Sequence, residues 1–345
     1  MMGKNQQIQI MRGLAITIVL IRHAIAQVNT DVLLDAVEDI IICFHMPVFF
    51  VIAGFLFQRG LSKYLQKEKG QFIIGKAKHL MLPYLFWTLL LWMGVQIACM
   101  TSSSVLEKMT DIGFAPMSIG NLIYGLLTYQ VYYTEHLWFL YVLFVLFLIN
   151  IYMAKSGDTR VCLIIWLSLG FLTRFVTLPH IIERTMEWGV FFSFGRYIQA
   201  NNITKKMSGG GYSVCIYVTF IVASIVRVTC LKSGIIGVAF SLFIQLDKYI
   251  IGFAGVGVIH LLAYTIAKSS IGKAFKCIGD YSFDIYLMHN PYCVAFSAVV
   301  LNGFLGVSSY ATVFFATVLG IAIPMVVSRF VIRKNRLLST VMIGR

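Results

Sequence analysis

The feature that most constrains this chain is a series of apolar runs, each long enough to cross a lipid bilayer. A helix needs about 20 mainly apolar residues to span a hydrocarbon core of roughly 30 Å. Hydrophobic residues make up 59% of the 345-residue chain and charged residues only 12%, whereas soluble domains are about 25% charged. The sequence therefore predicts an all-α, polytopic integral membrane protein and excludes a water-soluble globular domain.

Ten runs qualify as predicted membrane spans. They are residues 8–28, 40–57, 80–100, 137–154, 161–178, 186–200, 212–231, 249–267, 281–301 and 309–331. Two shorter apolar stretches, 119–131 and 235–246, are expected to be interfacial, re-entrant or extensions of neighbouring helices. Because ten crossings consume about 200 residues, no length remains for a soluble catalytic domain. We therefore expect 1–345 to form a single integral membrane domain.

The positive charge of the chain is distributed unevenly over the predicted connections. A formal net charge of +14 would suit a nucleic-acid binder. With the N-terminus inside, however, eighteen Lys and Arg residues fall in inward-facing segments and four in outward-facing loops. This positive-inside pattern predicts cytoplasmic N- and C-termini in a multi-pass protein of the cell membrane, a bacterial cytoplasmic membrane in our interpretation. We expect membrane lipid as a partner and no nucleic acid.

The longest basic connection and the N-terminus leave alternatives open. The first outer loop is expected at Asn29–Asp39, and the longest basic connection at Gln58–His79. This basic connection is either a solvated loop attracted to anionic headgroups or a site for a phosphorylated cytoplasmic ligand. The N-terminal segment resembles a signal peptide that ends in Ala24-Ile25-Ala26. Arg22 and His23 interrupt that pattern, so we expect the first span to be retained.

The seven cysteines give no sign of a metal site. They are scattered over apolar segments without a C-x-x-C spacing. Small buried hydrophobic side chains are the expected role of such cysteines, and no metal is predicted.

Arg12 and His23 are the ionisable residues of the first span with the most informative spacing. They are eleven residues apart, almost three helical turns, so they project from nearly the same face about 16 Å apart. Arg12 is expected near the cytoplasmic mouth and His23 just beyond the midplane. This spacing suits a ligand that enters from the cytoplasm with a charged end and places its reactive end deep in the membrane. The alternative for His23 is a hydrogen-bonded packing residue.

Five motifs in order resemble those of membrane acyltransferase family 3, and the match looks closest to its fucose 4-O-acetylase-like branch. The first is Arg12 and His23 with ten residues between them. The others are FHMPVFFVIAGF at 44–55, LPYLFW at 82–87, HLWFL at 136–140 and GDYSFDIYLMH at 279–289. They are spread across about 280 residues of the chain.

The resemblance implies a ten-helix membrane enzyme that moves an acyl group, usually acetyl from acetyl-CoA, to a hydroxyl of a carbohydrate or other extracytoplasmic acceptor. It implies that Arg12 helps to hold acyl-CoA and that His23 acts in catalysis. The residue types suit these roles, because a guanidinium binds phosphate through charge-assisted hydrogen bonds. An imidazole can deprotonate a hydroxyl near neutral pH. An acyl-histidine intermediate is the covalent alternative.

The chain departs from the family pattern in three places. Ala53 replaces the usual serine, and Lys76, Lys78 and His79 occupy a loop that is usually arginine-rich. We still expect Lys76 and Lys78 to contribute to binding the CoA phosphates. Arg22 precedes the catalytic histidine where a small or apolar residue is commoner. Arg22 is expected to bind donor or acceptor, or to pair with another buried group.

The remaining candidates are acceptor-binding residues. His45 and His289 are expected at depths similar to that of His23, and the alternative for each is a structural hydrogen bond. Glu135, His136 and Trp138 cluster before the fourth span and could bind a sugar by stacking and hydrogen bonding. The alternative for Trp138 is the aromatic belt at the membrane interface.

These observations predict an O-acetyltransferase that acts on a cell-envelope or exported glycan, such as an exopolysaccharide or a lipid-linked sugar. Cytoplasmic acetyl-CoA is the expected donor, and glycan assembly proteins are expected further partners. A transporter or flippase of polysaccharide is the rival hypothesis, although the two halves of the sequence lack the internal symmetry common in transporters. A membrane scaffold would leave Arg12 and His23 without a function.

Overall fold

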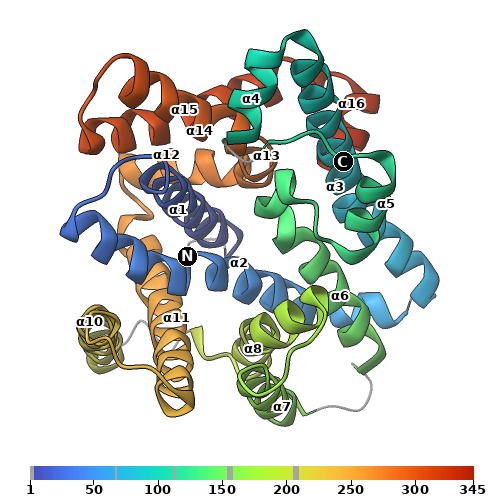
Figure 1. Cartoon of the computed structure of the whole chain (residues 1–345). Helices are drawn as coiled ribbons and strands as arrows, with labels where there is room; N and C mark the ends of the chain where they lie inside the picture. Colours follow the sequence, from blue (N-terminus) through green and yellow to red (C-terminus); the bar gives the residue numbers. More distant parts are fainter. Residues whose placement is uncertain (1–3, 67, 112–113, 154–157, 205–209) are drawn as a thin grey trace. The chain divides into compact units, whose positions relative to one another are not determined.

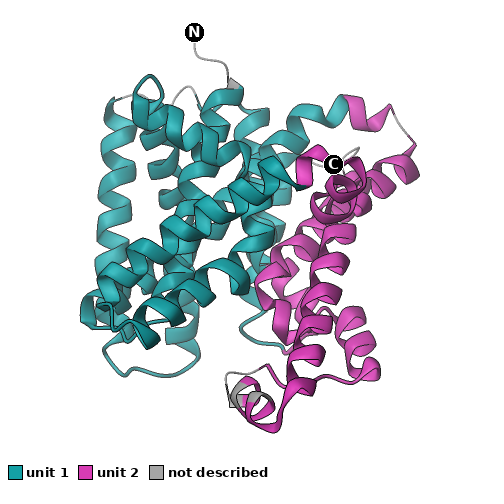
Figure 2. Cartoon of the chain, turned by 90° about the horizontal axis from the view of Figure 1, so that it is seen from above, with its two compact units in different colours: residues 1–62, 157–176, 187–331 teal, residues 63–156, 177–186, 332–345 magenta. Residues whose placement is uncertain are grey.

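The computed structural model describes residues 4–66, 68–111, 114–153, 158–204 and 210–345, and within these ranges the chain is helical, without strands. It divides into two compact units (Figure 2). Unit 1 comprises residues 1–62, 157–176 and 187–331, and unit 2 comprises residues 63–156, 177–186 and 332–345. Each unit is therefore assembled from segments that are far apart in the sequence.

Unit 1 contains most of the long helices (Figure 1). In chain order they are α1 (Lys4–Ile25), α2 (Val32–Leu65), α7 (Thr159–Leu172), α8 (His180–Ala200), α10 (Gly210–Leu231), α11 (Val238–Ile266), α12 (Ser270–Asp280), α13 (Ser282–Met288), the π-helical η2 (His289–Cys293), α14 (Val294–Ala298), the π-helical η3 (Val299–Phe304) and α15 (Ser309–Phe330). The last residues of α2 and the first residues of α8 belong to unit 2.

Unit 2 is built around two long helices that pack together, α3 (Lys69–Thr101) and α6 (Trp138–Met153). The other elements are α4 (Ser103–Asp111), α5 (Ile119–Thr128), η1 (Tyr132–Leu137), η4 (Ile332–Lys334) and α16 (Arg336–Ile343). The C-terminal α16 packs on α3, where Trp87 donates a hydrogen bond to the Met342 carbonyl at 2.9 Å.

Helix α1 is the centre of unit 1, because it packs against α11, α12, α13, α14 and α15. Two glycines allow the backbones of α1 and α12 to touch. A Cβ on Gly13 would overlap the Phe275 carbonyl, and a Cβ on Gly279 would overlap the Gln9 carbonyl. Small residues permit such close approach between membrane helices. The glycines therefore fix α1 on α12.

Seven apolar helices in the described part of the chain are long enough to cross a membrane. They cover Asn5–Ile25, Val32–Leu65, Lys69–Thr101, Ile119–Met153, Gly210–Leu231, Val238–Ile266 and Ser309–Lys334. The fourth of these runs through α5, η1 and α6, and the last through α15 and η4. The predicted count of ten is not confirmed. The run at 161–178 forms the 14-residue α7, 186–200 lies inside the more polar α8, and 281–301 is divided between four short elements.

Two predicted connections prove to be helical. Helix α2 begins at Val32, inside the predicted loop Asn29–Asp39, and continues to Leu65. Helix α3 begins at Lys69, so the basic connection Gln58–His79 is mostly helix and Lys76 and Lys78 are not loop residues. The reason is that Leu, Gln and Lys are good helix formers, so a helix can extend beyond its apolar run.

One of the two shorter apolar stretches adopts a form that the sequence predicts. Residues 235–246 largely form the beginning of α11, which starts at Val238. Residues 119–131 form the separate helix α5, which ends where Tyr129 adopts a left-handed conformation with φ of 58°. The prediction that a short stretch extends a neighbouring helix is thus confirmed for residues 235–246.

Candidate active site

Two of the predicted histidines meet inside unit 1. His23 lies in the last turn of α1, and His289 is the first residue of η2. Their ring centroids are 4.9 Å apart and their planes are inclined by 62°, so one ring presents its edge to the other. His289 is completely buried, whereas His23 is half-buried. This histidine pair joins the first and the last of the five sequence motifs.

The position of His289 follows from a break in the helix. Pro291 has no backbone N–H and cannot continue a regular α-helix. Asn290 leaves the helical region with φ of −129° and ψ of 137°, and the Asn290–Pro291 peptide bond is cis. Such π-helical segments are frequent at functional sites. The break turns the chain at the point where His289 contacts α1.

His289 is held by a hydrogen bond to its own helix. Its Nδ1 lies 2.7 Å from the Tyr286 carbonyl, and because a carbonyl only accepts, Nδ1 must carry the proton. Asp284, on the same helix, accepts a hydrogen bond from Ser328 of α15, and both residues are fully buried. The bond to Tyr286 orients the His289 ring, and the bond between Asp284 and Ser328 attaches α13 to α15.

Arg12 lies on the same continuous helix as His23, as the sequence predicts. Their eleven-residue separation therefore corresponds to about 16 Å along α1. Arg12 is half-buried, and its Nη1 is 3.5 Å from Gln9 Oε1. The helix thus carries a cation toward its N-terminal end and an imidazole in its last turn.

Arg22 pairs with a residue that the sequence did not single out as its partner. Its Nε lies 3.1 Å from Oε1 of Glu38, in the second turn of α2. The two side chains are 28% and 26% exposed. Of the roles expected for Arg22, the structure supplies the ion-pair partner.

His45 makes the helix-internal hydrogen bond that was its structural alternative. Its Nδ1 donates to the Ile41 carbonyl at 2.7 Å, four residues earlier in α2, and the side chain is buried. A neutral His45 therefore keeps Nε2 as an acceptor. The predicted contact of His45 with an acceptor substrate stays a prediction.

The other five predicted site residues lie in unit 2. Glu135 is exposed and His136 is buried where η1 meets α6. Trp138 is half-buried, with the Arg184 guanidinium 5.0 Å from the centre of its ring. The three residues lie at the junction of η1 and α6, and their binding of a sugar stays a prediction.

The two predicted lysines differ in their surroundings. The Lys76 ammonium lies 4.0 Å from the centre of the Phe147 ring, and Phe72 is a second aromatic neighbour at 5.5 Å. A cation over an aromatic face is attracted by the ring quadrupole. Lys78 is exposed. Aromatic packing therefore accounts for Lys76, whereas Lys78 is accessible to an anionic ligand.

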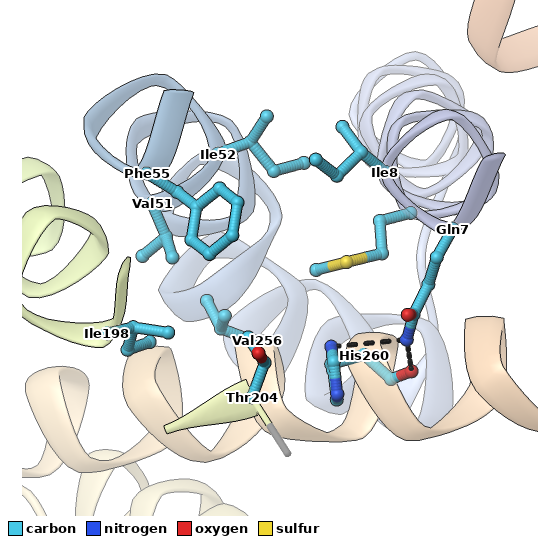
Figure 3. Close-up of a pocket in the computed structure, with 10 residues that line it drawn as sticks. Gln7, Ile8, Val51, Ile52, Phe55, Ile198, Thr204, Val256 and His260 are labelled. Atoms are coloured by element: carbon cyan, nitrogen blue, oxygen red, sulfur yellow. Dashed lines mark hydrogen bonds between the residues drawn. The ribbon is translucent and has the colours of Figure 1, made fainter. Parts of the chain in front are cut away.

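A separate cavity of about 70 Å³ lies toward the N-terminal end of α1. Figure 3 shows that most of its lining is apolar, from Ile8 on α1 to Phe55 on α2. Gln7 Nε2 approaches both Nδ1 and the carbonyl of His260 at 3.3 Å. Because Gln7 and His23 are sixteen residues apart, about 24 Å along the helix, this cavity is not part of the histidine pair.

Among the described residues, no group of three or more His, Cys, Asp or Glu side chains could hold a metal ion. The expectation of buried cysteines is wrong for Cys215 and Cys277, which are exposed. Cys215 lies on α10, of whose apolar window only 17% is buried. That helix packs mainly on α11, which leaves Cys215 without covering protein.

Three contributors to the site escaped the sequence reasoning. Glu38 pairs with Arg22, Tyr286 supplies a carbonyl to His289, and Pro291 breaks the helix. Only Pro291 left a clear signal, because proline in a predicted span indicates a kink. A backbone carbonyl as hydrogen-bond partner has no sequence signature.

The fold and the site define a class: a multi-pass, all-helical membrane protein with a histidine pair between its helices. The chain belongs to the acyltransferase domain family, whose model matches residues 5–329. The resemblance found in the five motifs is thus confirmed at the level of the family, and the protein is an acyltransferase by family.

One similar protein is the nodulation protein NolL of Mesorhizobium japonicum (strain LMG 29417 / CECT 9101 / MAFF 303099), which is 30% identical over 105 residues. The match covers 29% of this chain and 27% of NolL, so the chain matches about a quarter of that relative. The comparison with solved structures found no match.

Proposed function

We propose that this protein transfers an acetyl group from cytoplasmic acetyl-CoA to a hydroxyl of a cell-envelope or exported carbohydrate. The observation that carries the proposal is the close approach of the His23 and His289 rings, whose centroids are 4.9 Å apart. It occurs in a chain of the acyltransferase domain family. The motif resemblance to fucose 4-O-acetylase-like proteins supports a sugar hydroxyl as acceptor. In this proposal the N-terminal end of α1 faces the cytoplasm.

His23 is the general base of the proposed reaction. The acceptor hydroxyl attacks the thioester carbonyl while His23 takes its proton, so the new C–O bond forms as the C–S bond breaks. The proton then passes to the departing CoA sulfur, which leaves as a thiol. General bases of this kind contribute typically 10²- to 10⁴-fold to the rate. A covalent variant, with acetyl carried briefly on His23, uses the same residue.

Arg12 holds the donor in this proposal. A guanidinium forms paired hydrogen bonds with phosphate, and CoA carries phosphates at the end opposite to its thioester. With Arg12 about 16 Å from His23 along α1, the pantetheine arm can reach from the phosphate site to the base. Lys76 and Lys78 are proposed as additional cations. Family membership favours this enzyme over the rival transporter.

Inverted membrane vesicles, which expose the cytoplasmic face, provide the test. With labelled acetyl-CoA outside, wild-type vesicles should form labelled glycan. His23→Ala should lower the rate by about 100-fold or more, as expected for loss of a general base. His260→Gln is the matched control, because it alters another histidine of unit 1 near the opposite end of α1.

An unchanged rate in correctly inserted His23→Ala protein would contradict the proposal. Transport of unmodified glycan would favour the rival function. Mass spectrometry of envelope glycans from cells with and without the protein identifies the acceptor sugar and the mass of the acyl group.

A further inference from the structure

We propose that His289 is a positioning residue for His23, accepting its ring N–H on Nε2 and thereby holding His23 in one tautomer. The role deepens the proposed function, and its catalytic consequence rests on that function. The hydrogen bond itself can be tested without any activity. The proposed chain of groups is the Tyr286 carbonyl, His289, His23 and the substrate hydroxyl.

The hydrogen bond to Tyr286 determines what the far side of His289 can do. Nδ1 carries the proton that is donated to the carbonyl at 2.7 Å. In a neutral imidazole with a protonated Nδ1, Nε2 has a lone pair and accepts. His289 has no exposed surface, and burying a charge without a paired opposite charge is costly. Its Nε2 is therefore an acceptor directed away from its own helix.

The two rings are close and inclined, so that the edge of one faces the other ring. Imidazole nitrogens lie in the ring plane, so they form hydrogen bonds only at the edge. An inclination of 62° with centroids 4.9 Å apart places an edge of one ring against the other ring. A parallel stack would direct the nitrogens of both rings elsewhere. The rings are neighbours, but among the described residues no donor lies within hydrogen-bond distance of His289 Nε2. The proposed bond therefore requires a small rotation of the half-buried His23 side chain.

The consequence for catalysis is a fixed tautomer. If His23 donates one N–H to His289, its other nitrogen has the lone pair that a general base needs. Catalytic histidines are commonly oriented by a hydrogen bond on the nitrogen that does not face the substrate. A carboxylate in that position also stabilises the imidazolium, whereas neutral His289 supplies orientation alone. His289 thus acts through His23.

The break at η2 supports this role over simple packing. A packing residue would be satisfied by any apolar side chain of similar size on a regular helix. Here the chain departs from helical geometry at Asn290, immediately after His289. On the preceding helix, the bond between Asp284 and Ser328 holds α13 to α15. The local structure therefore fixes both the backbone and the ring of His289.

Two amide substitutions distinguish the hydrogen-bonding roles of the two imidazole nitrogens. In His289→Asn, the amide N–H can replace Nδ1–H toward Tyr286, but no acceptor remains at the Nε2 position. In His289→Gln, the longer amide can place an oxygen at the Nε2 position. We expect Asn to lower kcat roughly 10- to 100-fold, the usual cost of removing an outer hydrogen-bond partner of a functional histidine. Gln should retain most of kcat, and both should leave KM for acetyl-CoA unchanged.

The second readout is the tautomer of His23 itself. In protein labelled with ¹⁵N-histidine and held in lipid nanodiscs, the His23 signals are assigned by their loss in His23→Ala. Wild-type and His289→Gln proteins should show a single neutral tautomer, and His289→Asn should show a mixture. Thermal melting of each variant verifies that it is folded.

The positioning role is overturned if His23 keeps one tautomer in folded His289→Asn, or if Asn and Gln lower kcat equally. Equal losses with an unchanged tautomer would identify His289 as a packing residue. If wild-type protein transfers no acyl group at all, the proposed function fails, while the ¹⁵N spectra still decide whether His289 holds the proton of His23.

Discussion

At the scale of single residues, two ionisable side chains of α1 meet partners from other elements of unit 1. His23 and His289 were both candidates, and they lie in contact. Arg22 had three expected roles, and the structure pairs it with Glu38, a residue in a segment expected to be a loop. A charge inside a membrane span requires a partner or a cavity, but only the fold decides which one it finds.

Arg12 provides a prediction at this scale. Replacing it with Gln removes the charge while keeping a similar length, so a phosphate would lose its charge-assisted hydrogen bonds. Such bonds contribute about 1.5–3 kcal/mol, so KM for acetyl-CoA should rise roughly 10- to 100-fold while kcat changes little. Initial rates at varied donor concentration measure both constants. Lys76→Gln is the comparison, and a larger effect there than at Arg12 would place the phosphates in unit 2.

At the scale of elements, glycine contacts decide where helix α1 lies. Helix α1 meets α12 with backbone against backbone, because Gly13 and Gly279 present no side chains. Helices α2 and α8 approach in the same way, where Gly54 faces the Phe192 carbonyl and Gly195 faces the Val51 carbonyl. Such contacts maximise packing between helices in a lipid environment, where apolar burial drives association only weakly. The position of His23 therefore depends on residues with no chemical role.

Gly13→Ala tests this dependence. The new Cβ would overlap the Phe275 carbonyl, and the backbones must separate because a carbonyl cannot rotate away. Overpacking usually costs about 1–3 kcal/mol, so the melting temperature in detergent or nanodiscs should fall. Gly94→Ala in α3 is the control, because a Cβ there meets no atom within 4 Å and alanine favours helix. Equal melting temperatures for the two variants would contradict the close α1–α12 contact.

At the scale of the whole molecule, segments distant in the sequence are tied together within each unit. In unit 1 the turn before α2 meets the start of α15: Ser309 donates to the Asn29 carbonyl at 2.8 Å, and Tyr310 donates to Asp31 Oδ2 at 2.5 Å. Asp31 also accepts hydrogen bonds from the backbone N–H groups of Leu33 and Leu34 at the start of α2. One carboxylate thus joins two helix starts.

This tie should depend on pH. The hydrogen bond from Tyr310, with the backbone bonds from Leu34 and Leu33, lowers the pKa of Asp31 from its usual value of 3.8. A lowered folded-state pKa means that the stabilisation is present above the unfolded pKa and is lost as pH falls through the folded pKa. Limited cleavage of the segment before α2 by an acid-active protease should therefore increase as pH falls through that value.

Tyr310→Phe supplies the control for this pH dependence. Without the hydroxyl, the pKa of Asp31 should return toward its usual range, and cleavage should begin at a higher pH than in the wild type. Because Asp31 is exposed, we expect a local change in cleavage with little change in global melting. Identical cleavage profiles for the two proteins would exclude the Tyr310–Asp31 bond as the cause.

The sequence by itself determined the helical membrane class, the family and the pairing of Arg12 with His23 on one helix. Each of these follows from local properties: the length of apolar runs, motif order and the helical repeat. It did not determine where spans break. Pro291 interrupts the predicted span 281–301, and α2 and α3 extend through predicted connections.

Only the tertiary structure decided which distant groups meet. The contact between His23 and His289 requires α13 and η2 to lie against α1. The partner of Arg22 depends on the packing of α1 beside the beginning of α2. The physical reason is that hydrophobic patterns specify which segments are buried, but a buried helix has apolar residues on every side and no marked partner face. Backbone contacts at glycines and hydrogen bonds to carbonyls settle that choice.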